Sequence, residues 1–490
     1  MQIVLRGVGA GYEAANTVRL FYPQARPAET PAPEGELAAA VSHACTDFVL
    51  LRQGGKLIWQ VARHAPEQDT VANEYALCRL LYGMLRQHTG QRPPWGMMTG
   101  VRPVRIIHDL RAAGATEEQV ADRFLQHFDC TPEKFQLALD IANRQRPVLQ
   151  AAGPMDCSVY AGIPFCPTRC SYCSFVSRMV GDKATRALVQ PYVDALCREL
   201  TEIRATVQRC GLRVRTLYIG GGTPTSLDAA QLEQLMAHIA ATFDVAALEE
   251  YTVEAGRPDC TDAEKLRILK QYGATRISIN PQTFSDDVLH NIGRCHTAQD
   301  IVDCYAAARA AGHQNINMDL IAGLPGDTVQ GFERSLRTAI DLAPENITVH
   351  TLTLKRASNL VVEQQAAAYD DVQAMLERCT LLSDAGYAPY YLYRQKGTLQ
   401  NLENTGWSRP GFDCLYNIYI MEEVHTILSA GAGGSTKLVM PGARHGKIER
   451  VFNYKYPTEY LSRFDTVLER KRAVEEFYAQ HTSPKTSGQQ

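Results

Sequence analysis

The sequence predicts an α/β fold: a partial (β/α)6 TIM-like barrel, preceded by an N-terminal α+β domain and followed by a small C-terminal domain. Two observations predict the barrel. From about residue 157, short β-branched runs alternate with amphipathic helical patterns, and these runs are almost continuously apolar. Both features are typical of parallel strands that are covered by helices. The length of 490 residues indicates two or three domains.

The barrel is expected over residues 155–386. Its six strands are expected at 157–163, 214–220, 250–255, 276–280, 315–321 and 346–352. The helices between them are expected at 184–207, 228–243, 261–272, 297–311 and 328–341, and another helix at 365–386. Ligands of parallel α/β folds bind at the carboxyl ends of the strands, so the residues that follow each strand are the candidates for function.

The N-terminal domain is expected over residues 1–150. Runs at 47–52 and 56–61 flank Gln53-Gly54-Gly55, which indicates a hairpin, and helices are expected at 70–88, 117–128 and 132–149. The glycines of Gly7-x-Gly9-x-Gly11 lack the last glycine of a dinucleotide-binding loop, where Tyr12 stands, and no helix start is evident after them. A glycine-rich turn is therefore favoured, and the role of the domain stays open.

The C-terminal domain is expected over residues 387–480, and we expect it to cover the substrate. Its first seventy residues are rich in Tyr, Gly and Asn and include Gly431-Ala432-Gly433-Gly434.

Charge and hydropathy exclude several classes of protein. The formal net charge is −3 and no long Lys/Arg block is present, which argues against nucleic acid as a partner. No apolar run is long enough to predict a membrane span, and the first residues lack a signal-peptide pattern. The 14 cysteines are scattered, which indicates reduced thiols and a cytoplasmic protein.

Three of these cysteines have the spacing of metal ligands. Cys166, Cys170 and Cys173 form C-x3-C-x2-C directly after the first barrel strand. Three thiolates can hold three irons of a [4Fe–4S] cluster and leave the fourth iron open. Zinc is the alternative, but a structural zinc site takes four ligands and the next candidate position is Phe175. The spacing therefore favours a cluster.

A glycine run and four polar residues follow the later strands. Gly220, Gly221 and Gly222, before Thr223, remove every Cβ at a strand end, which suits either a tight turn or close approach of a ligand. The polar residues at or beyond strand ends are Glu254, Gln282, Arg294 and Asp319. Each alone is more typical of a cap or an ion pair. Together they predict one rim, where a carboxylate suits ribose hydroxyls and an arginine suits a carboxylate. S-adenosylmethionine has both groups.

These motifs resemble the radical S-adenosylmethionine superfamily. Within it, the chain resembles the oxygen-independent coproporphyrinogen III oxidases, or coproporphyrinogen dehydrogenases, and in particular the longer variety of Gram-positive bacteria. The resemblance covers roughly 155–440. It is carried by the segment from Tyr160 to Cys173, by Gly220–Thr225, and by the motifs at 254–258, 279–284, 318–326 and 99–103.

The resemblance implies the site residues and the cofactors. Cys166, Cys170 and Cys173 would bind a [4Fe–4S] cluster. The residues that would line the site of S-adenosylmethionine are Tyr160, Tyr172, Gly221, Gly222, Thr223, Glu254, Gln282, Arg294 and Asp319.

The implied reaction is the oxidative decarboxylation of coproporphyrinogen III to protoporphyrinogen IX in haem biosynthesis. A 5′-deoxyadenosyl radical would take hydrogen from each reacting propionate, and an electron donor and an acceptor, both unidentified, would complete the reaction. Porphyrinogen carboxylates need cationic partners, and the candidates are Arg178, Lys355, Arg356 and Arg394, each of which could instead be a solvated charge.

Two other functions stay open. Relatives with phenylalanine at the position of Phe175 include haem chaperones without oxidase activity. Another radical enzyme acting on a tetrapyrrole, for example a methyltransferase, is the third possibility.

Overall fold

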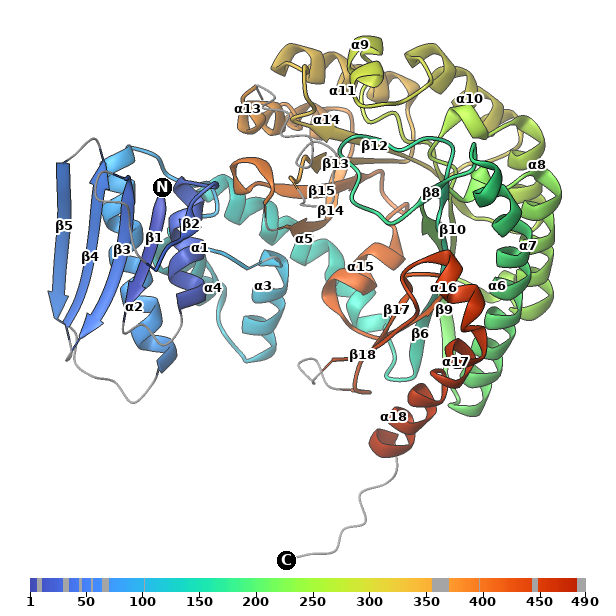
Figure 1. Ribbon diagram of the computed structural model, residues 1–490, viewed down its shortest axis with the longest axis horizontal. Coiled ribbons are helices and arrows are strands. Elements are labelled where there is room, and N and C mark those ends of the chain that lie inside the picture. The colour runs from blue at the N-terminus through green and yellow to red at the C-terminus, as the bar shows by residue number, and fades with distance from the viewer. Residues whose placement is uncertain are drawn as a thin grey trace, which may run out of the picture. The chain divides into compact units, whose positions relative to one another are not determined.

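A computed structural model of the protein describes residues 1–6, 11–29, 35–43, 46–53, 56–63, 70–100, 102–354, 370–395, 397–442 and 448–482 (Figure 1). These residues form two compact units. The smaller unit comprises Met1–Asp140 with Tyr393–Glu403, and the larger unit comprises Ile141–Leu392 with Asn404–Gln490. No helix among the described residues is long and apolar enough to cross a membrane.

The smaller unit is built on a five-stranded sheet in the order β2-β1-β3-β4-β5. The strands are β1 (Gln2–Arg6), β2 (Arg26–Pro27), β3 (Leu37–His43), β4 (Thr46–Gln53) and β5 (Lys56–Arg63). β4 and β5 pair antiparallel with Gln53 opposite Lys56, which confirms the predicted hairpin, although its two turn residues lie outside the described ones. Helices α1 (Gly11–Phe21) and α2 (Thr70–Thr89) share a buried core with the sheet that includes Ile3, Val18, Leu51 and Leu81.

The start of α1 differs from the sequence prediction. A helix begins at Gly11, the last of the three glycines, where no helix start was expected. Residues 7–10 lie outside the described part of the chain. The remaining helices of this region are α3 (Pro103–Ala112), α4 (Glu117–Asp122), a π-helical turn at Arg123–His127, and α5 (Pro132–Ala151), which continues into the larger unit.

A buried polar network fastens residues 393–403 to the smaller unit. The indole N–H of Trp95 donates to Oε2 of Glu403 across 2.8 Å, and Nζ of Lys134 lies 2.5 Å from Oε1 of the same carboxylate. The guanidinium of Arg394 donates to the carbonyl groups of Met98 and Gly100 at 2.5 and 3.2 Å. The turn-rich stretch after Trp95 therefore anchors a segment that lies about 300 residues later in the chain.

The larger unit contains the predicted parallel strands. They are β6 (Asp156–Ile163), β9 (Arg213–Gly221), β10 (Glu250–Glu254), β11 (Arg276–Ser278), β12 (Ile316–Ala322) and β13 (Asn346–Thr351). They lie side by side in the order β13-β12-β11-β10-β9-β6, all parallel, which confirms the predicted six-strand partial barrel. In β10 every residue is buried except the last, Glu254, so the strand presents one polar side chain at its carboxyl end.

Five long helices cover the outer side of these strands (Figure 1). They are α6 (Lys183–Arg209), α7 (Ala229–Thr242), α8 (Ala263–Gln271), α10 (Ala298–Ala310) and α11 (Val329–Leu342). Each begins after an Asp or Thr whose side chain accepts a hydrogen bond from the first helical turn, which explains why the predicted starts are accurate. A short helix, α9 (Asp286–Asn291), precedes α10.

The helix predicted at 365–386 is interrupted. Its beginning lies outside the described residues, and the rest forms two short helices, α13 (Val372–Glu377) and α14 (Thr380–Asp384).

Residues 387–480 do not form a separate C-terminal unit, which corrects the expected boundary. Strand β15 (Glu403–Ser408) pairs antiparallel with β13, and β14 (Ala388–Arg394) lies beyond it. At the other edge β16 (Thr426–Ala430) runs parallel beside β6, followed by β17 (Ser435–Leu438) and β18 (Glu449–Phe452). These strands thus extend the six parallel strands into one eleven-stranded sheet. Helices α15 (Leu415–Glu422), α16 (Pro457–Ser462), α17 (Phe464–Glu469) and α18 (Arg472–Thr482) complete the unit.

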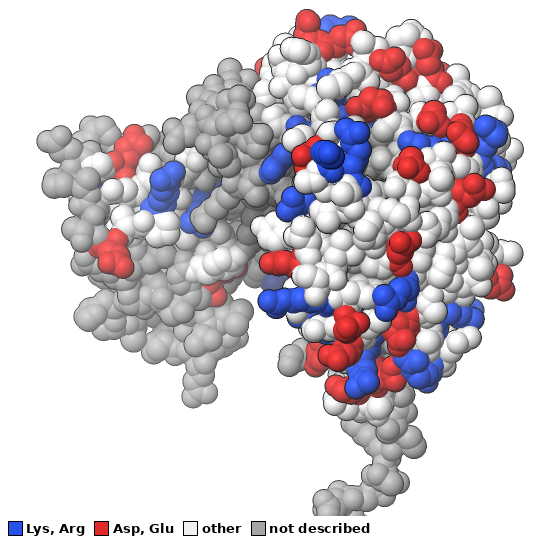
Figure 2. All heavy atoms as spheres, turned by 45° about the vertical axis from the view of Figure 1, so that its right-hand side comes forward, with Lys and Arg blue, Asp and Glu red and all other residues white. Residues whose placement is uncertain are grey.

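Both signs of charge are dispersed over the face of the larger unit in Figure 2, among many uncharged side chains. On this face the described residues form no continuous basic field of the kind that binds a phosphate backbone.

Candidate active site

The cysteine loop leaves the end of β6 and is held there by backbone hydrogen bonds. Phe165 and Cys166 form the two-residue strand β7, which pairs with β8 (Arg178–Met179) where the loop returns. The amide of Gly222 donates to the carbonyl of Ile163 at 2.7 Å, and the amide of Thr223 donates to the carbonyl of Phe165 at 2.8 Å. The glycine run after β9 is therefore bonded directly to the start of the cysteine loop.

A cavity of about 150 Å³ lies between this loop and the neighbouring strand ends. It brings together nine of the twelve site residues expected from the sequence: Cys166, Cys170, Cys173, Tyr172, Gly222, Thr223, Glu254, Gln282 and Arg294. Tyr160, Gly221 and Asp319 do not line it. The residues that line it come from the cysteine loop after β6, from the segments after β9, β10 and β11, and from the last residue of β10, as expected for the carboxyl ends of parallel strands.

The glycine run leaves room that side chains would fill. A Cβ on Gly220 would lie 2.9 Å from the Glu254 carboxylate, and one on Gly222 would lie 2.9 Å from Sγ of Cys166. Gly221 has a φ of +116° and its Cβ would meet the carbonyl of Ile163 at 2.9 Å. The run therefore allows the cysteine loop and Glu254 to approach the backbone, in addition to making a turn.

Glu254 is held at the rim of the cavity. The hydroxyl of Tyr218 donates to its Oε1 across 2.7 Å. Burial raises the pKa of this carboxyl to about 7, although the hydrogen bond from Tyr218 acts in the opposite direction. Tyr218 stacks on Tyr416, and Tyr160 stacks beside both rings, so Tyr160 contacts the tyrosine that holds Glu254.

Gln282 and Arg294 carry buried polar atoms that have no partner among the described residues. These atoms are Oε1 of Gln282 and Nε of Arg294. Gln282 holds a left-handed backbone with a φ of +67°, fixed where its amide donates to the carbonyl of Asp319 at 2.8 Å. Arg294 donates from Nη1 to the carbonyl of Asn280 at 2.6 Å and from Nη2 to the hydroxyl of Tyr172 at 3.4 Å. Buried polar atoms without partners in a cavity wall indicate a polar ligand.

Asp319 does not line the cavity but contacts Gln282, which does. Its side chain accepts a hydrogen bond from Nδ2 of Asn317 at 2.7 Å and lies 3.7 Å from Nε2 of His350. Although burial opposes ionisation, the hydrogen bond and charge of His350 hold the pKa of Asp319 below its ordinary value. The backbone carbonyl of Asp319 accepts a hydrogen bond from the amide of Gln282, and through this bond Asp319 positions Gln282.

The structure describes two of the four cations expected to bind substrate, Arg178 and Arg394. Arg178 is exposed on β8, beside the cysteine loop. Lys355 and Arg356 lie outside the described residues. Arg394 is buried in the smaller unit and donates to backbone carbonyls there, so its expected role in binding a carboxylate is wrong.

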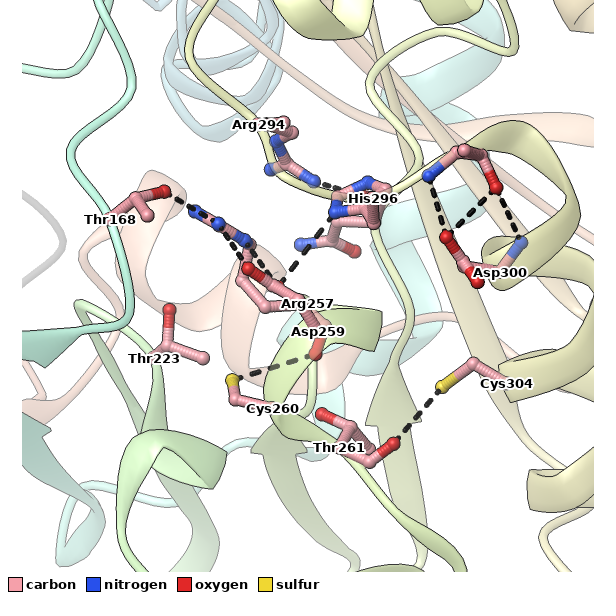
Figure 3. Close-up of polar contacts among 12 residues, drawn as sticks. Thr168, Thr223, Arg257, Asp259, Cys260, Thr261, Arg294, His296, Asp300 and Cys304 are labelled. Atoms are coloured by element: carbon pink, nitrogen blue, oxygen red, sulfur yellow. Dashed lines mark hydrogen bonds and ion pairs between the residues drawn. The ribbon is translucent and has the colours of Figure 1, made fainter. Parts of the chain in front are cut away.

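Sequence reasoning missed a group of residues around Arg257 (Figure 3). Arg257 lines the cavity, and so do Thr168 and Asn280. Asp259 and His296 lie behind Arg257. The sequence signal that could have identified Arg257 was its position three residues after Glu254. A charged residue just beyond a strand end faces the same rim as the other strand-end residues.

The three cysteines suit a cluster better than one metal ion. Among the described residues no three His, Cys, Asp or Glu side chains converge as ligands of a single ion do. In a cubane each cysteine binds a different iron, so sulfurs distributed around a cavity are what it requires. The unpaired atoms of Gln282 and Arg294 in the same wall fit a polar ligand at the open iron.

Comparison with known proteins agrees with this site. The Radical SAM superfamily model matches residues 160–339, which contain all the cysteine, glycine and strand-end motifs. In the solved structures, coproporphyrinogen III oxidase (HemN) from Escherichia coli superposes with a TM-score of 0.52 at 23% identity, over 67% of this chain and 73% of that one. The fold and site thus define a radical S-adenosylmethionine protein.

Curated relatives give the family. The oxygen-independent coproporphyrinogen-III oxidase-like protein HemZ of Bacillus subtilis is 40% identical over 395 residues, 79% of this chain and 78% of the relative. The heme chaperone HemW of Lactococcus lactis is 31% identical over 65% of this chain and 79% of the relative. The chain belongs to the oxygen-independent coproporphyrinogen III oxidase-like family of the radical S-adenosylmethionine superfamily. Its cofactors are a [4Fe–4S] cluster and S-adenosylmethionine.

Proposed function

We propose that the protein is a coproporphyrinogen dehydrogenase, which converts two propionate groups of coproporphyrinogen III to vinyl groups and yields protoporphyrinogen IX. The observation that carries the proposal is the cavity in which three cysteines meet the unpaired polar atoms of Gln282 and Arg294. The choice of substrate is supported by the relative named as oxidase-like, which matches over 79% of the chain.

In this proposal Cys166, Cys170 and Cys173 hold the cluster. Glu254 accepts hydrogen bonds from ribose hydroxyls, and Gln282 and Arg294 bind the amino acid part of S-adenosylmethionine. Gly222 and Thr223 keep the backbone close to the cysteine loop. Tyr160, Gly221 and Asp319 act from outside the cavity wall by holding these groups in place, and Tyr172 orients Arg294.

The cofactors, when bound, supply a radical that can remove a hydrogen atom. Each reacting propionate loses one hydrogen atom from the carbon next to the ring, then one electron and carbon dioxide, and the two remaining carbons become a vinyl group. The electron passes to a one-electron acceptor. The role of the chain is to fix the propionate beside the cavity and to exclude water. Arg178, exposed beside the cysteine loop, is a candidate to hold a propionate.

The described cysteines are all free thiols, which supports a reducing compartment such as the cytoplasm as the place of action.

An anaerobic assay tests the proposal. Reconstituted protein receives a reductant, S-adenosylmethionine and coproporphyrinogen III, and products are followed by mass. We expect 5′-deoxyadenosine together with singly and doubly decarboxylated porphyrinogens. The Cys170→Ser variant should lose both products, whereas Cys210→Ser, after α6, should keep them. Release of 5′-deoxyadenosine without decarboxylation contradicts the choice of substrate only.

A haem chaperone is the second candidate. It is favoured by relatives that carry this name and by Phe175, which is 40% exposed beside Cys173. This function predicts stoichiometric haem binding and no decarboxylation in the same preparation. A haem titration followed by absorbance, run beside the assay, separates the two candidates.

A further inference from the structure

We infer that Arg257 is a positioning residue that raises the reduction potential of the cluster through a charged hydrogen bond to Cys170. The inference rests on the proposed assignment of the three cysteines as cluster ligands.

Each of the three sulfurs accepts a hydrogen bond, and the kinds of donor differ. Cys166 accepts from the hydroxyl of Thr223 at 3.6 Å, and Cys173 accepts from the backbone amide of Phe175 at 3.4 Å. Cys170 accepts from Nη1 of Arg257 at 3.6 Å. The donors to Cys166 and Cys173 are neutral and the donor to Cys170 is a cation, so the three sulfurs are electrostatically unequal.

Arg257 is fixed in this position from three directions (Figure 3). Its Nε and Nη2 donate to the two carboxylate oxygens of Asp259 at 2.9 and 2.7 Å, and Nη2 also donates to the hydroxyl of Thr168 at 2.8 Å. The side chain is only 5% exposed. Thr168 lies inside the cysteine loop, so one guanidinium ties the loop to the segment after β10. Such a bidentate pair orients the remaining N–H group toward Cys170.

Asp259 has a second neighbour on its far side. Nδ1 of His296 lies 3.8 Å from Oδ1 of Asp259. Neither ring nitrogen of His296 has a hydrogen-bond partner among the described residues. A second cavity of about 440 Å³ begins there, lined by Asp259, His296 and the exposed Cys295. Arg257 lines the first cavity and Asp259 lines the second, so this ion pair forms part of the wall between them.

The charge of Arg257 acts on the cluster because reduction adds negative charge that spreads onto the sulfurs. Hydrogen bonds to the sulfurs and nearby positive charge favour the reduced state. Asp259 cancels part of this effect at longer range, but Arg257 lies between Asp259 and Cys170. The sign of the net effect is therefore set by the residue that touches the sulfur.

Redox titration of the reconstituted protein, followed by electron paramagnetic resonance, tests the inference. Removing the cation in Arg257→Gln should lower the ratio of reduced to oxidised cluster about tenfold at a fixed applied potential. For a one-electron couple this change corresponds to a reduction potential lower by about 59 mV. Removing the anion in Asp259→Asn should raise this ratio. The double variant has the net charge of the wild type and lacks the hydrogen bond, so its ratio should lie between wild type and Arg257→Gln.

Opposite shifts separate this role from a merely structural one, since a loosened loop would move both single variants the same way. An unchanged ratio in Arg257→Gln, or shifts of the same sign, overturns the inference. Arg309→Gln is the matched control, because its partners are Tyr305 and Glu345 and it contacts none of the cysteines. If Arg257→Gln takes up no cluster, the Asp259→Asn variant still tests the inference, because its ratio of reduced to oxidised cluster should rise above that of the wild type. Failure of the wild type to take up a reducible cluster contradicts the ligand assignment instead.

Discussion

The hydroxyl of Tyr218 and the carboxylate of Glu254 meet at 2.7 Å across the adjacent strands β9 and β10. Gly220, two residues after Tyr218 in β9, leaves space for this contact, because a Cβ there would lie 2.8 Å from the Tyr218 ring and 2.9 Å from the carboxylate. The pair fixes the direction of Glu254, and burial gives its carboxyl a pKa of about 7. Its protonation therefore changes near neutral pH in the cofactor-free protein.

Glu254→Gln should remove a pH dependence of stability. The carboxyl has a pKa near 4.5 when exposed and about 7 in the folded protein, so the folded state retains a proton that the unfolded state has lost. The contribution of this group to the free energy of unfolding therefore falls as pH rises from about 4.5 to about 7. At pH 8 the variant should be more stable than wild type by about 1–3 kcal/mol. Urea denaturation at pH 5 and 8 measures this, with the α7 variant Glu233→Gln as control. An equal difference between variant and wild type at both pH values would contradict the prediction.

Gly222→Ala should disturb the cysteine loop. The added Cβ would lie 2.5 Å from the carbonyl of Phe165 and 2.9 Å from Sγ of Cys166, so the backbone must move. We expect the iron content after reconstitution to fall at least several-fold. Gly181→Ala, at the end of the same loop with no atom within 4 Å of its Cβ, should load normally. Equal iron content in the two variants would show that close approach at Gly222 is not needed.

Gln282→Met should weaken cofactor binding without weakening the fold. Oε1 of Gln282 has no partner among the described residues, so removing it loses no hydrogen bond in the cofactor-free protein. The free energy of unfolding should stay within about 0.5 kcal/mol of wild type or rise. The dissociation constant of S-adenosylmethionine should rise about tenfold, since one charge-assisted hydrogen bond contributes about 1.5 kcal/mol. Equilibrium binding to reconstituted protein measures it, with Gln271→Met on α8 as control. Unchanged affinity would exclude Gln282 from the binding site.

Lys134→Met should destabilise the smaller unit by about 3–5 kcal/mol, because it removes a cationic partner of the buried Glu403. Although burial opposes ionisation, Lys134 and Trp95 hold the pKa of Glu403 below its ordinary value. The stabilisation by this carboxylate is therefore present above its unfolded pKa and lost as pH falls through the lower folded value. The double variant Lys134→Met/Glu403→Gln should regain most of the loss. Thermal unfolding of the three proteins checks this, and a double variant no more stable than the single one contradicts it.

The parallel strands and the helices around them could be predicted to within a few residues, since each strand is a short apolar run and each helix begins at an Asp or Thr cap. The cysteine loop and most strand-end residues followed from the same pattern, because parallel strands bring their carboxyl ends to one rim. The strands added after residue 387 could not be assigned to this sheet. Pairing of β16 with β6 joins residues about 270 positions apart, and such a contact leaves no local sign.

Arg257 and Arg394 show that the partners of a single charged residue could not be predicted from the sequence either. In the sequence each is a single arginine whose neighbours do not indicate its partner. One lies against Cys170, and the other is buried under Trp95 with backbone carbonyls as partners. The difference is decided by side chains that the fold brings in from other elements.

The position of β16 beside β6 has a consequence for the order in which the protein matures. The strand that leads into the cysteine loop gains one neighbour, β9, by residue 221, but its other neighbour is made only at Thr426–Ala430. During synthesis β6 therefore has an open edge until most of the chain has been translated. Contacts between such distant segments form late in folding. A truncation before Thr426 would remove β16 and leave β6, the strand that leads into the cysteine loop, with one edge unpaired.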